Sequence, residues 1–193
     1  MAKVSAMLVV LISLGSGALA QGLLPELPYP GGYTFLRYEI RAPGQAALQW
    51  ILEVIPKDDS YEVKMAFTRK IPASERFSLF GVYMGVDMMG AKDLPLASLF
   101  SVWDKEVEPG KSYLLRKRAR LVTEGEAEIL GIPVVTGIYL HPDHPDLRAV
   151  VYIPRLSHRA LVLFPPYFRV EKKEGNGWSV VEEIELVEFA HEG

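Results

Sequence analysis

The run His-Pro-Asp-His-Pro-Asp at 141–146 holds the residue types most able to do chemistry in this sequence. Two imidazoles and two carboxylates bind a divalent metal when they project toward one point. The two prolines favour an extended, exposed turn instead, and turns prefer Asp and Pro for reasons of backbone geometry alone. We therefore predict a turn that holds no metal, with the metal site of an exported hydrolase as the alternative.

Other catalytic patterns are weaker. Ser157 and His158 are adjacent, and a nucleophile and its base rarely face each other at that spacing. The chain has no cysteine, so thiol chemistry is excluded, and its glycines match neither phosphate-binding nor dinucleotide-binding patterns. The 24 acidic residues offer many carboxylate pairs for sugar hydrolysis, but nothing selects one of them. We expect a protein that is not an enzyme and that uses no cofactor.

The one basic cluster comprises Arg116, Lys117, Arg118 and Arg120. If 112–122 is a strand, its arginines point to one side, because side chains alternate along a strand. One interpretation is a groove for anionic head groups or phosphates. The interpretation that we favour is a solvated sheet face, paired across strands with the acidic C-terminal residues Glu182, Glu183 and Glu185.

The segment 77–103 is rich in large apolar and aromatic residues. Methionine is polarisable and unbranched, and surfaces that accept varied apolar ligands use it often. Glycines at 81, 85 and 90 would let the segment open. An apolar segment of this kind commonly packs in the core of a protein. The functional alternative is that the segment forms a lid over an apolar groove. The ligand-binding residues predicted for that groove are Phe80, Met84, Met88, Met89, Phe100 and Trp103.

Most of the remaining chain alternates apolar and polar residues, which predicts strands. The first strand covers 33–41, with Thr34, Leu36, Tyr38 and Ile40 on one face. The second covers 47–55, and the third has the clearest apolar face, which we expect to be buried: Tyr61, Val63, Met65 and Phe67. These three strands predict an antiparallel meander.

A short helix follows, capped by Asp93, with Leu96, Leu99, Phe100 and Trp103 on one face. Later strands are predicted at 112–122, 126–130, 134–140, 148–153, 160–164 and 167–172, with turns at 131–133, 141–146 and 175–177. Residues 178–189 favour a last strand, although a helical period also fits them. The predicted fold is mainly β: a curved antiparallel sheet or half-barrel with one short helix packed against it.

Residues 1–20 have the pattern of a secretory signal peptide, with Lys3, an apolar run from Val4 to Leu14, and Ala-Leu-Ala at 18–20. We expect cleavage after Ala20 and a periplasmic or secreted protein that does not span the membrane. Retention of the run as an anchor is the alternative. Residues 21–32 are rich in Pro and Gly and predict an extended arm, followed by a single β-rich domain at 33–193.

Composition narrows the class of protein. A formal net charge of −3 gives the chain no general attraction to nucleic acid. The absence of cysteine favours a bacterial periplasm or cell surface over a disulfide-bonded extracellular module. Cysteine is absent, Asn occurs once and Gln three times, and this scarcity is one mark of thermophile proteins.

Residues 126–189 resemble the periplasmic lipoprotein-carrier and sorting families (LolA/LolB-like). The likeness lies in the strand pairs of GEAEILGIPVVTGIYLHPDHPDLRAVVYI and in the hairpin PPYFRVEKKEGNGWSVVEEIELVEF. In those families a curved antiparallel sheet wraps around helices and holds acyl chains on its concave face. The chain lacks a lipobox cysteine, so the resemblance implies the open half-barrel and an apolar ligand rather than the lipoprotein-carrying role itself.

Three functions follow in order of preference. The first is a non-enzymatic carrier or binding protein for an apolar or acylated ligand, held between the sheet and 77–103. The second is a structural or interaction protein of the cell envelope, with an envelope protein as its partner. The third is the metal-dependent hydrolase that uses 141–146.

Overall fold

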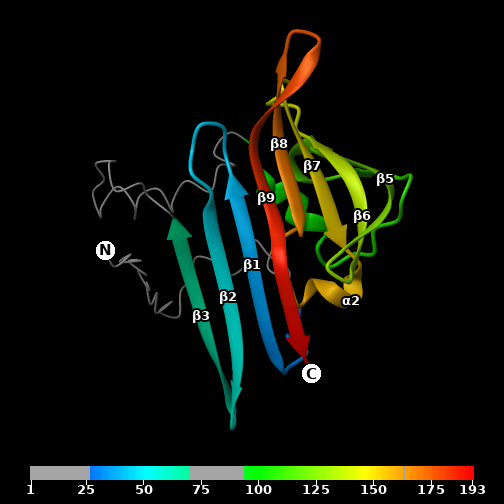
Figure 1. Cartoon of the computed structure of the whole chain (residues 1–193). Coiled ribbons are helices and arrows are strands. Elements are labelled where there is room, and N and C mark those ends of the chain that lie inside the picture. The colour runs from blue at the N-terminus through cyan, green and yellow to red at the C-terminus, as the bar shows by residue number, and fades with distance from the viewer. Residues whose placement is uncertain (1–26, 70–93, 163) are drawn as a thin grey trace, which may run out of the picture.

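The computed structural model describes residues 27–69, 94–162 and 164–193. Nine described strands form one antiparallel sheet in the order β3-β2-β1-β9-β8-β7-β6-β5-β4 (Figure 1). The strands are β1 (Tyr33–Arg41), β2 (Leu48–Lys57), β3 (Ser60–Arg69), β4 (Ser112–Leu114), β5 (Arg120–Ile129), β6 (Ile132–Leu140), β7 (Leu147–Pro154), β8 (Tyr167–Glu174) and β9 (Gly177–Glu192). The helical segments are η2 (Leu96–Val102), η3 (Arg116–Arg118) and α2 (Leu156–Arg159).

The long last strand joins two meanders into one sheet. Strands β1 to β3 form the predicted antiparallel meander, and β4 to β9 form a second one. The 16 residues of β9 pair with β8 near the start of the strand and with β1 farther along. The C-terminal segment is therefore a strand, and the helical alternative for 178–189 is wrong.

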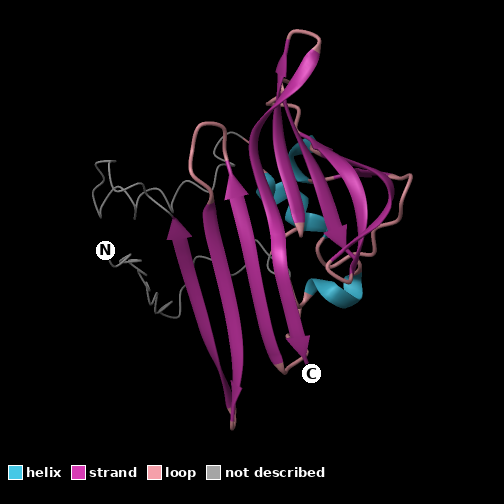
Figure 2. Ribbon diagram, in the orientation of Figure 1, coloured by secondary structure: helices cyan, strands magenta, loops and turns pink. Residues whose placement is uncertain are grey.

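The sheet is open and bends strongly at β5 to β8 (Figure 2). The end strands β3 and β4 do not pair with each other, so the described strands form an open sheet rather than a closed barrel. The predicted mainly β fold with a curved antiparallel sheet is confirmed. No helix among the described residues is long and apolar enough to cross a membrane.

The core lies on the concave face of the sheet. All four residues predicted for the inner face of β1 are buried there: Thr34, Leu36, Tyr38 and Ile40. Tyr38 stacks on Trp50 at 5.4 Å between ring centroids, and its hydroxyl donates a 2.7 Å hydrogen bond to the Phe164 carbonyl. The Tyr139 hydroxyl donates to the Pro95 carbonyl at 2.6 Å. Two buried tyrosines thus attach the inner segments to the sheet.

The predicted burial of the β3 face is only partly right. The strand and its register are as expected, but Tyr61 is 50% exposed and Val63 is 57% exposed. Met65 and Phe67 are half-buried. Among the described strands, β3 lies at the edge of the sheet with a neighbour on one side only, so its inner face is less covered than that of β1.

The prediction of one strand over 112–122 is wrong. A turn interrupts it, because β4 ends at Leu114 and β5 begins at Arg120. The Leu115 amide donates to the Ala119 carbonyl at 2.8 Å, which closes the turn around η3. The arginines are nevertheless exposed to solvent, as predicted.

Two predictions of local structure need correction near the inner segments. The helix at 96–102 is a 3-10 helix whose N-cap is Pro95 rather than the predicted Asp93, which lies outside the described residues. The strand predicted at 160–164 is wrong, because the helix α2 ends at Arg159 and a turn follows at 160–161. The tertiary bonds of Arg159 described below determine the path of the chain here and override the local strand pattern.

The predicted turns at 131–133, 141–146 and 175–177 connect neighbouring strands, although the first begins at Leu130 and β6 already includes Pro133. Residues 1–20, which carry the predicted signal peptide, and the segment 70–93 lie outside the described residues, so the predictions made for them are not tested by the structure.

Candidate functional site

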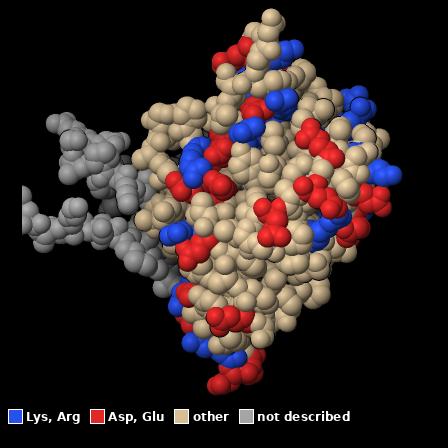
Figure 3. Space-filling view, turned by 45° about the vertical axis from the view of Figure 1, so that its right-hand side comes forward, with Lys and Arg blue, Asp and Glu red and all other residues tan. Residues whose placement is uncertain are grey.

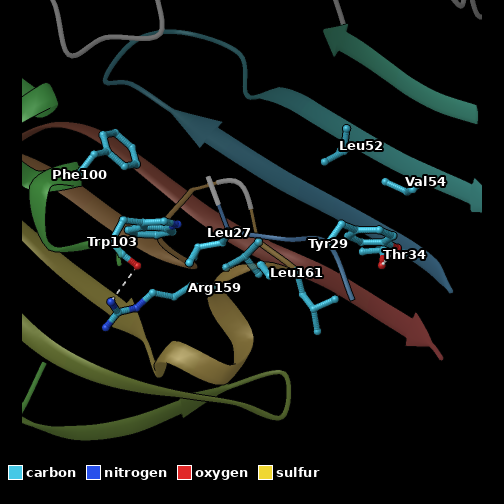
Figure 4. Close-up of a pocket in the computed structure, with 11 residues that line it drawn as sticks. Leu27, Tyr29, Thr34, Leu52, Val54, Phe100, Trp103, Arg159 and Leu161 are labelled. Atoms are coloured by element: carbon cyan, nitrogen blue, oxygen red, sulfur yellow. Dashed lines mark hydrogen bonds between the residues drawn. The ribbon is translucent and has the colours of Figure 1, made fainter. Parts of the chain in front are cut away.

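A pocket of about 200 Å³ lies between the concave face of the sheet and the inner segments (Figure 4). Four separate parts of the chain line it: the arm before β1, strands β1 and β2, the segment around η2, and α2 with the turn after it. The lining residues are Leu27, Tyr29, Thr34, Leu52, Val54, Phe100, Trp103, Arg159, Ala160, Leu161 and Val162.

The sheet supplies one wall of this pocket. Thr34 lies opposite Val54 in the β1–β2 register, and Leu36 lies opposite Leu52. Directly paired residues share one face of a sheet, so these side chains continue the buried inner face of β1. Leu52 and Val54 project from the same side of β2, two residues apart.

The arm residues close one end of the pocket with hydrogen bonds. The Tyr29 hydroxyl donates to the Gly32 carbonyl at 2.9 Å and lies 2.6 Å from the Thr34 hydroxyl. The Thr34 hydroxyl is in turn 3.0 Å from His191 Nδ1 on β9. The polar atoms of Tyr29 and Thr34 are thus satisfied within the protein, and their hydrocarbon parts face the pocket.

Arg159 fixes the opposite wall. Its Nε donates to the Pro154 carbonyl at 2.7 Å, and its Nη1 donates to the carbonyls of Val102, Trp103 and Lys105, the first two at 2.7 and 3.0 Å. The side chain is 2% exposed, and this burial lowers the pKa of its guanidinium. No carboxylate of the described residues forms an ion pair with it. Arg159 therefore joins the end of η2 to α2.

The lining makes this pocket suited to an apolar group. Leucine, valine and aromatic side chains dominate it. Nε and Nη1 of Arg159 donate to backbone carbonyls, whereas its buried Nη2 has no hydrogen-bond partner among the described residues. An apolar cavity of about 150 Å³ in a protein core stays dry and binds a molecule of the size of benzene. A pocket of about 200 Å³ can accept a ring or the end of one acyl chain.

Two of the predicted ligand-binding residues, Phe100 and Trp103, line this pocket. The other four, Phe80, Met84, Met88 and Met89, lie outside the described residues. Sequence reasoning missed Leu27, Leu52, Val54 and Leu161. The apolar run at 47–55 predicts a strand that contains Leu52 and Val54, but only the pairing with β1 shows which face of the sheet they share.

The 141–146 run forms the predicted turn, but the expected exposure does not hold at His141, which is buried. The His144 amide donates to the His141 carbonyl at 3.1 Å, and the buried Nδ1 of His141 accepts from the Asp143 amide at 3.3 Å. The two imidazole rings lie 5.6 Å apart. Across the described parts of the chain, no three His, Asp or Glu side chains gather as a metal site would need.

Ser157 and His158 come closer than expected. The Ser157 hydroxyl lies 3.0 Å from His158 Nδ1 on the surface of α2. A catalytic triad also needs a carboxylate to orient the base, and none of the described carboxylates is hydrogen-bonded to His158. This pair therefore lacks a required member of that machinery in the described chain.

The predicted pairing of the basic cluster with the acidic C-terminal residues is wrong. Arg41 takes that place, with its Nη1 2.9 Å from both Glu183 and Glu185. Glu182 faces the other way and is buried, and burial raises the pKa of its carboxyl to about 7. The basic cluster lies instead at the far edge of the sheet, at the β4–β5 turn.

No known protein family matches the sequence, and no curated protein matches it. Among solved structures, one similar chain comes from the complex of Pseudomonas aeruginosa MucA and MucB, with a TM-score of 0.38 and 10% sequence identity. The match covers 82% of this chain and 51% of that chain, so this chain spans about half the length of the protein it resembles. A likeness this distant carries no argument about function, which must be argued from the site.

Proposed function

We propose that this protein is a non-enzymatic binding protein for an apolar group, such as the end of an acyl chain, held on the concave face of its sheet. The observation that supports this most directly is the pocket of about 200 Å³ with its predominantly apolar lining. The aromatic residues Phe100 and Trp103 were selected from the sequence for this purpose and line it.

The size of the pocket sets the expected affinity. Each buried methylene contributes about 0.8 kcal/mol, so an acyl end of about six carbons gains about 5 kcal/mol before the cost of association. Binding of a free fatty acid is therefore expected to be weak, with a dissociation constant of about a millimolar or higher. A longer chain gains more if it continues along the inner face of β2 and β3, toward the half-buried Met65 and Phe67.

The test is titration of the full chain with octanoic acid and palmitic acid, followed by calorimetry and thermal unfolding. A ligand stabilises the state that it binds, so the melting temperature should rise with fatty-acid concentration. Leu52→Trp should fill the pocket and weaken binding at least about tenfold, since a lost contact of about 1.4 kcal/mol is tenfold in affinity.

Ile51→Trp is the matched control. Ile51 is the neighbour of Leu52 in β2 but points to the convex face, where Ala66 of β3 lies opposite it. The Ile51→Trp variant gains the same side chain in the same strand, but outside the pocket. Its affinity for fatty acids should therefore equal that of the unmodified protein. Equal fatty-acid binding by the two variants, or no fatty-acid binding by the unmodified protein, would contradict the proposal.

We also propose that the protein is exported and begins at Gln21, after cleavage of the segment 1–20. The Ala-Leu-Ala sequence at 18–20 gives the small residues that signal peptidase requires. N-terminal sequencing of protein from the extracytoplasmic fraction of expressing bacteria should start at Gln21. Ala18→Arg should abolish that processing, and an unmodified protein that still begins with Met1 would contradict the assignment.

A further inference from the structure

The β4–β5 turn gathers unpaired positive charge at one edge of the sheet. Its basic residues, all exposed, are Arg116, Lys117, Arg118 and Arg120. None of the four forms an ion pair with a carboxylate of the described residues, whereas Arg41 and Arg155 on other parts of the surface each contact two or more. In a chain of net charge −3, this turn is a local exception.

The turn also presents its charges in an unusual backbone conformation. Lys117 and Arg118 have φ angles of 54° and 59°, the left-handed region that favours glycine. Two consecutive long side chains rarely occupy that region, and strain of this kind persists where surrounding contacts fix it. Here the bond from the Leu115 amide to the Ala119 carbonyl, at 2.8 Å, holds the base of the turn.

Exposed leucines stand beside these charges. Leu114 lies opposite Arg120 on β5, and Arg120 lies opposite Leu140 on β6, so the three form one row on the convex face. Leu114 is 76% exposed, the highest exposure of any large apolar side chain among the described residues, and Leu140 is 38% exposed. Figure 3 brings β5 and β6 forward and shows basic and acidic side chains interspersed on this side of the molecule, with uncharged surface between them.

A lipid surface is the partner whose chemistry matches both features. Phosphate head groups attract clustered lysine and arginine, and apolar side chains beside them gain by entering the boundary with the acyl chains. A nucleic acid would use the charges through its phosphates but would leave Leu114 in water. We propose that the β4–β5 turn, with Leu114 and Leu140 beside it, docks the protein on an anionic membrane surface.

The experiment is sedimentation of the full chain with vesicles that contain phosphatidylglycerol and with vesicles of phosphatidylcholine alone. Binding is expected only to the anionic vesicles, and it should weaken as salt is added, because salt screens exposed charges. The triple variant R116Q/K117Q/R118Q should bind about a hundredfold more weakly, since each basic residue near such a surface contributes about fivefold.

The charge-matched control is K57Q/K64Q/K105Q, which removes the same number of positive charges from exposed positions away from this turn. It should bind the anionic vesicles as the unmodified protein does. An equal loss in both triple variants would show that net charge alone governs binding and would overturn the proposal.

Leu114→Asn tests the apolar part and should weaken vesicle binding about tenfold. The side chain is so exposed that the fold should be unaffected, which the thermal unfolding curve checks. Binding by L114N equal to that of the unmodified protein would contradict insertion. Binding of a single-stranded oligonucleotide that the triple variant loses and L114N retains, with no vesicle binding, would identify a nucleic-acid surface and exclude a lipid one.

The result of the vesicle-binding experiment does not depend on the pocket. Leu52→Trp changes only the concave face, so it should leave vesicle binding unchanged, and L114N should leave fatty-acid binding unchanged. Failure of one proposal is therefore distinguishable from failure of the other.

Discussion

Arg159→Ala should lower the free energy of unfolding by about 3–5 kcal/mol, as large-to-alanine changes at fully buried positions do. Arg159 is 2% exposed and fills the space between η2 and α2. Truncation removes the packed side chain and also removes two donors: Nε, which bonds the Pro154 carbonyl, and Nη1, which bonds the carbonyls of Val102, Trp103 and Lys105. Buried acceptors that lose their donor cost about 1–3 kcal/mol each if water does not replace it.

Arg159→Met separates packing from hydrogen bonding. Methionine is long and flexible enough to fill most of the same volume, but it donates no hydrogen bond. Because the change also removes a buried charge that lacks a carboxylate partner, the expected loss is smaller, about 1–3 kcal/mol. The variant should still weaken fatty-acid binding, since the Trp103 wall of the pocket is no longer held to α2.

Arg155→Ala is the matched control for urea denaturation. Arg155 lies four residues earlier on the same segment, half-exposed, and contacts Glu106, Glu126 and the Val107 carbonyl. Partly exposed ion pairs contribute little, so its loss should stay near about 1 kcal/mol. A loss for Arg159→Ala no greater than that for Arg155→Ala would show that Arg159 does not hold the inner segments in place.

The alternation of apolar and polar residues predicted correctly which side of the sheet each side chain faces. It predicted only partly how far those side chains are buried. The alternation in β1 and β3 is equally clear, and both strands present their apolar residues to the concave face. Leu36 is fully buried whereas Val63 is 57% exposed, because β1 has neighbours on both sides and β3 is an edge strand. The position of a strand within a sheet depends on long-range pairing, which no local pattern of residues contains.

The missed turn has a different cause. Turn prediction relies on Gly, Pro, Asn and Asp, because these residues adopt the special backbone angles of turns. The β4–β5 turn has none of them and places Lys117 and Arg118 at positive φ instead. Tertiary pairing of β4 with β5 imposes that conformation against the local preference, so the sequence predicts a continuous strand.

The candidate site likewise contains residues that the sequence pattern identifies and residues that it does not. Phe100 and Trp103 were identifiable because apolar residues at helical spacing indicate a buried face. Arg159 was not, since arginine is almost always exposed unless its donors are satisfied. Three of the four carbonyls that accept from it come from Val102 to Lys105, more than 50 residues earlier in the chain, as the separations of 54 to 57 residues show.

Glu182→Gln should stabilise the fold at neutral and alkaline pH by about 2–3 kcal/mol. Glu182 is 4% exposed on β9, opposite the buried Val170, and its buried Oε1 has no hydrogen-bond partner among the described residues. Desolvation disfavours the charged carboxylate and raises the pKa from 4.5 to about 7. A difference of this size between the folded and unfolded states corresponds to about 3 kcal/mol.

The sign of the pH dependence follows from proton linkage. The folded protein holds the Glu182 proton more tightly than the unfolded chain, so stability falls as pH rises from about 4.5 to about 7 and stays lower above that range. Glutamine is neutral at every pH, so E182Q and the unmodified protein should be similar in stability near pH 4.5 and diverge as pH rises. Urea denaturation across this range measures the divergence directly.

Glu183→Gln provides the control for this pH profile. Glu183 is the next residue of β9, but its carboxylate accepts hydrogen bonds from Arg41 and from the Tyr167 hydroxyl, at 2.9 and 2.8 Å. The E183Q variant should be modestly less stable than the unmodified protein. Its stability should still decline between about pH 4.5 and 7, because Glu182 is present in it. If E182Q instead keeps the slope of the unmodified protein, Glu182 is charged without penalty and its surroundings admit water.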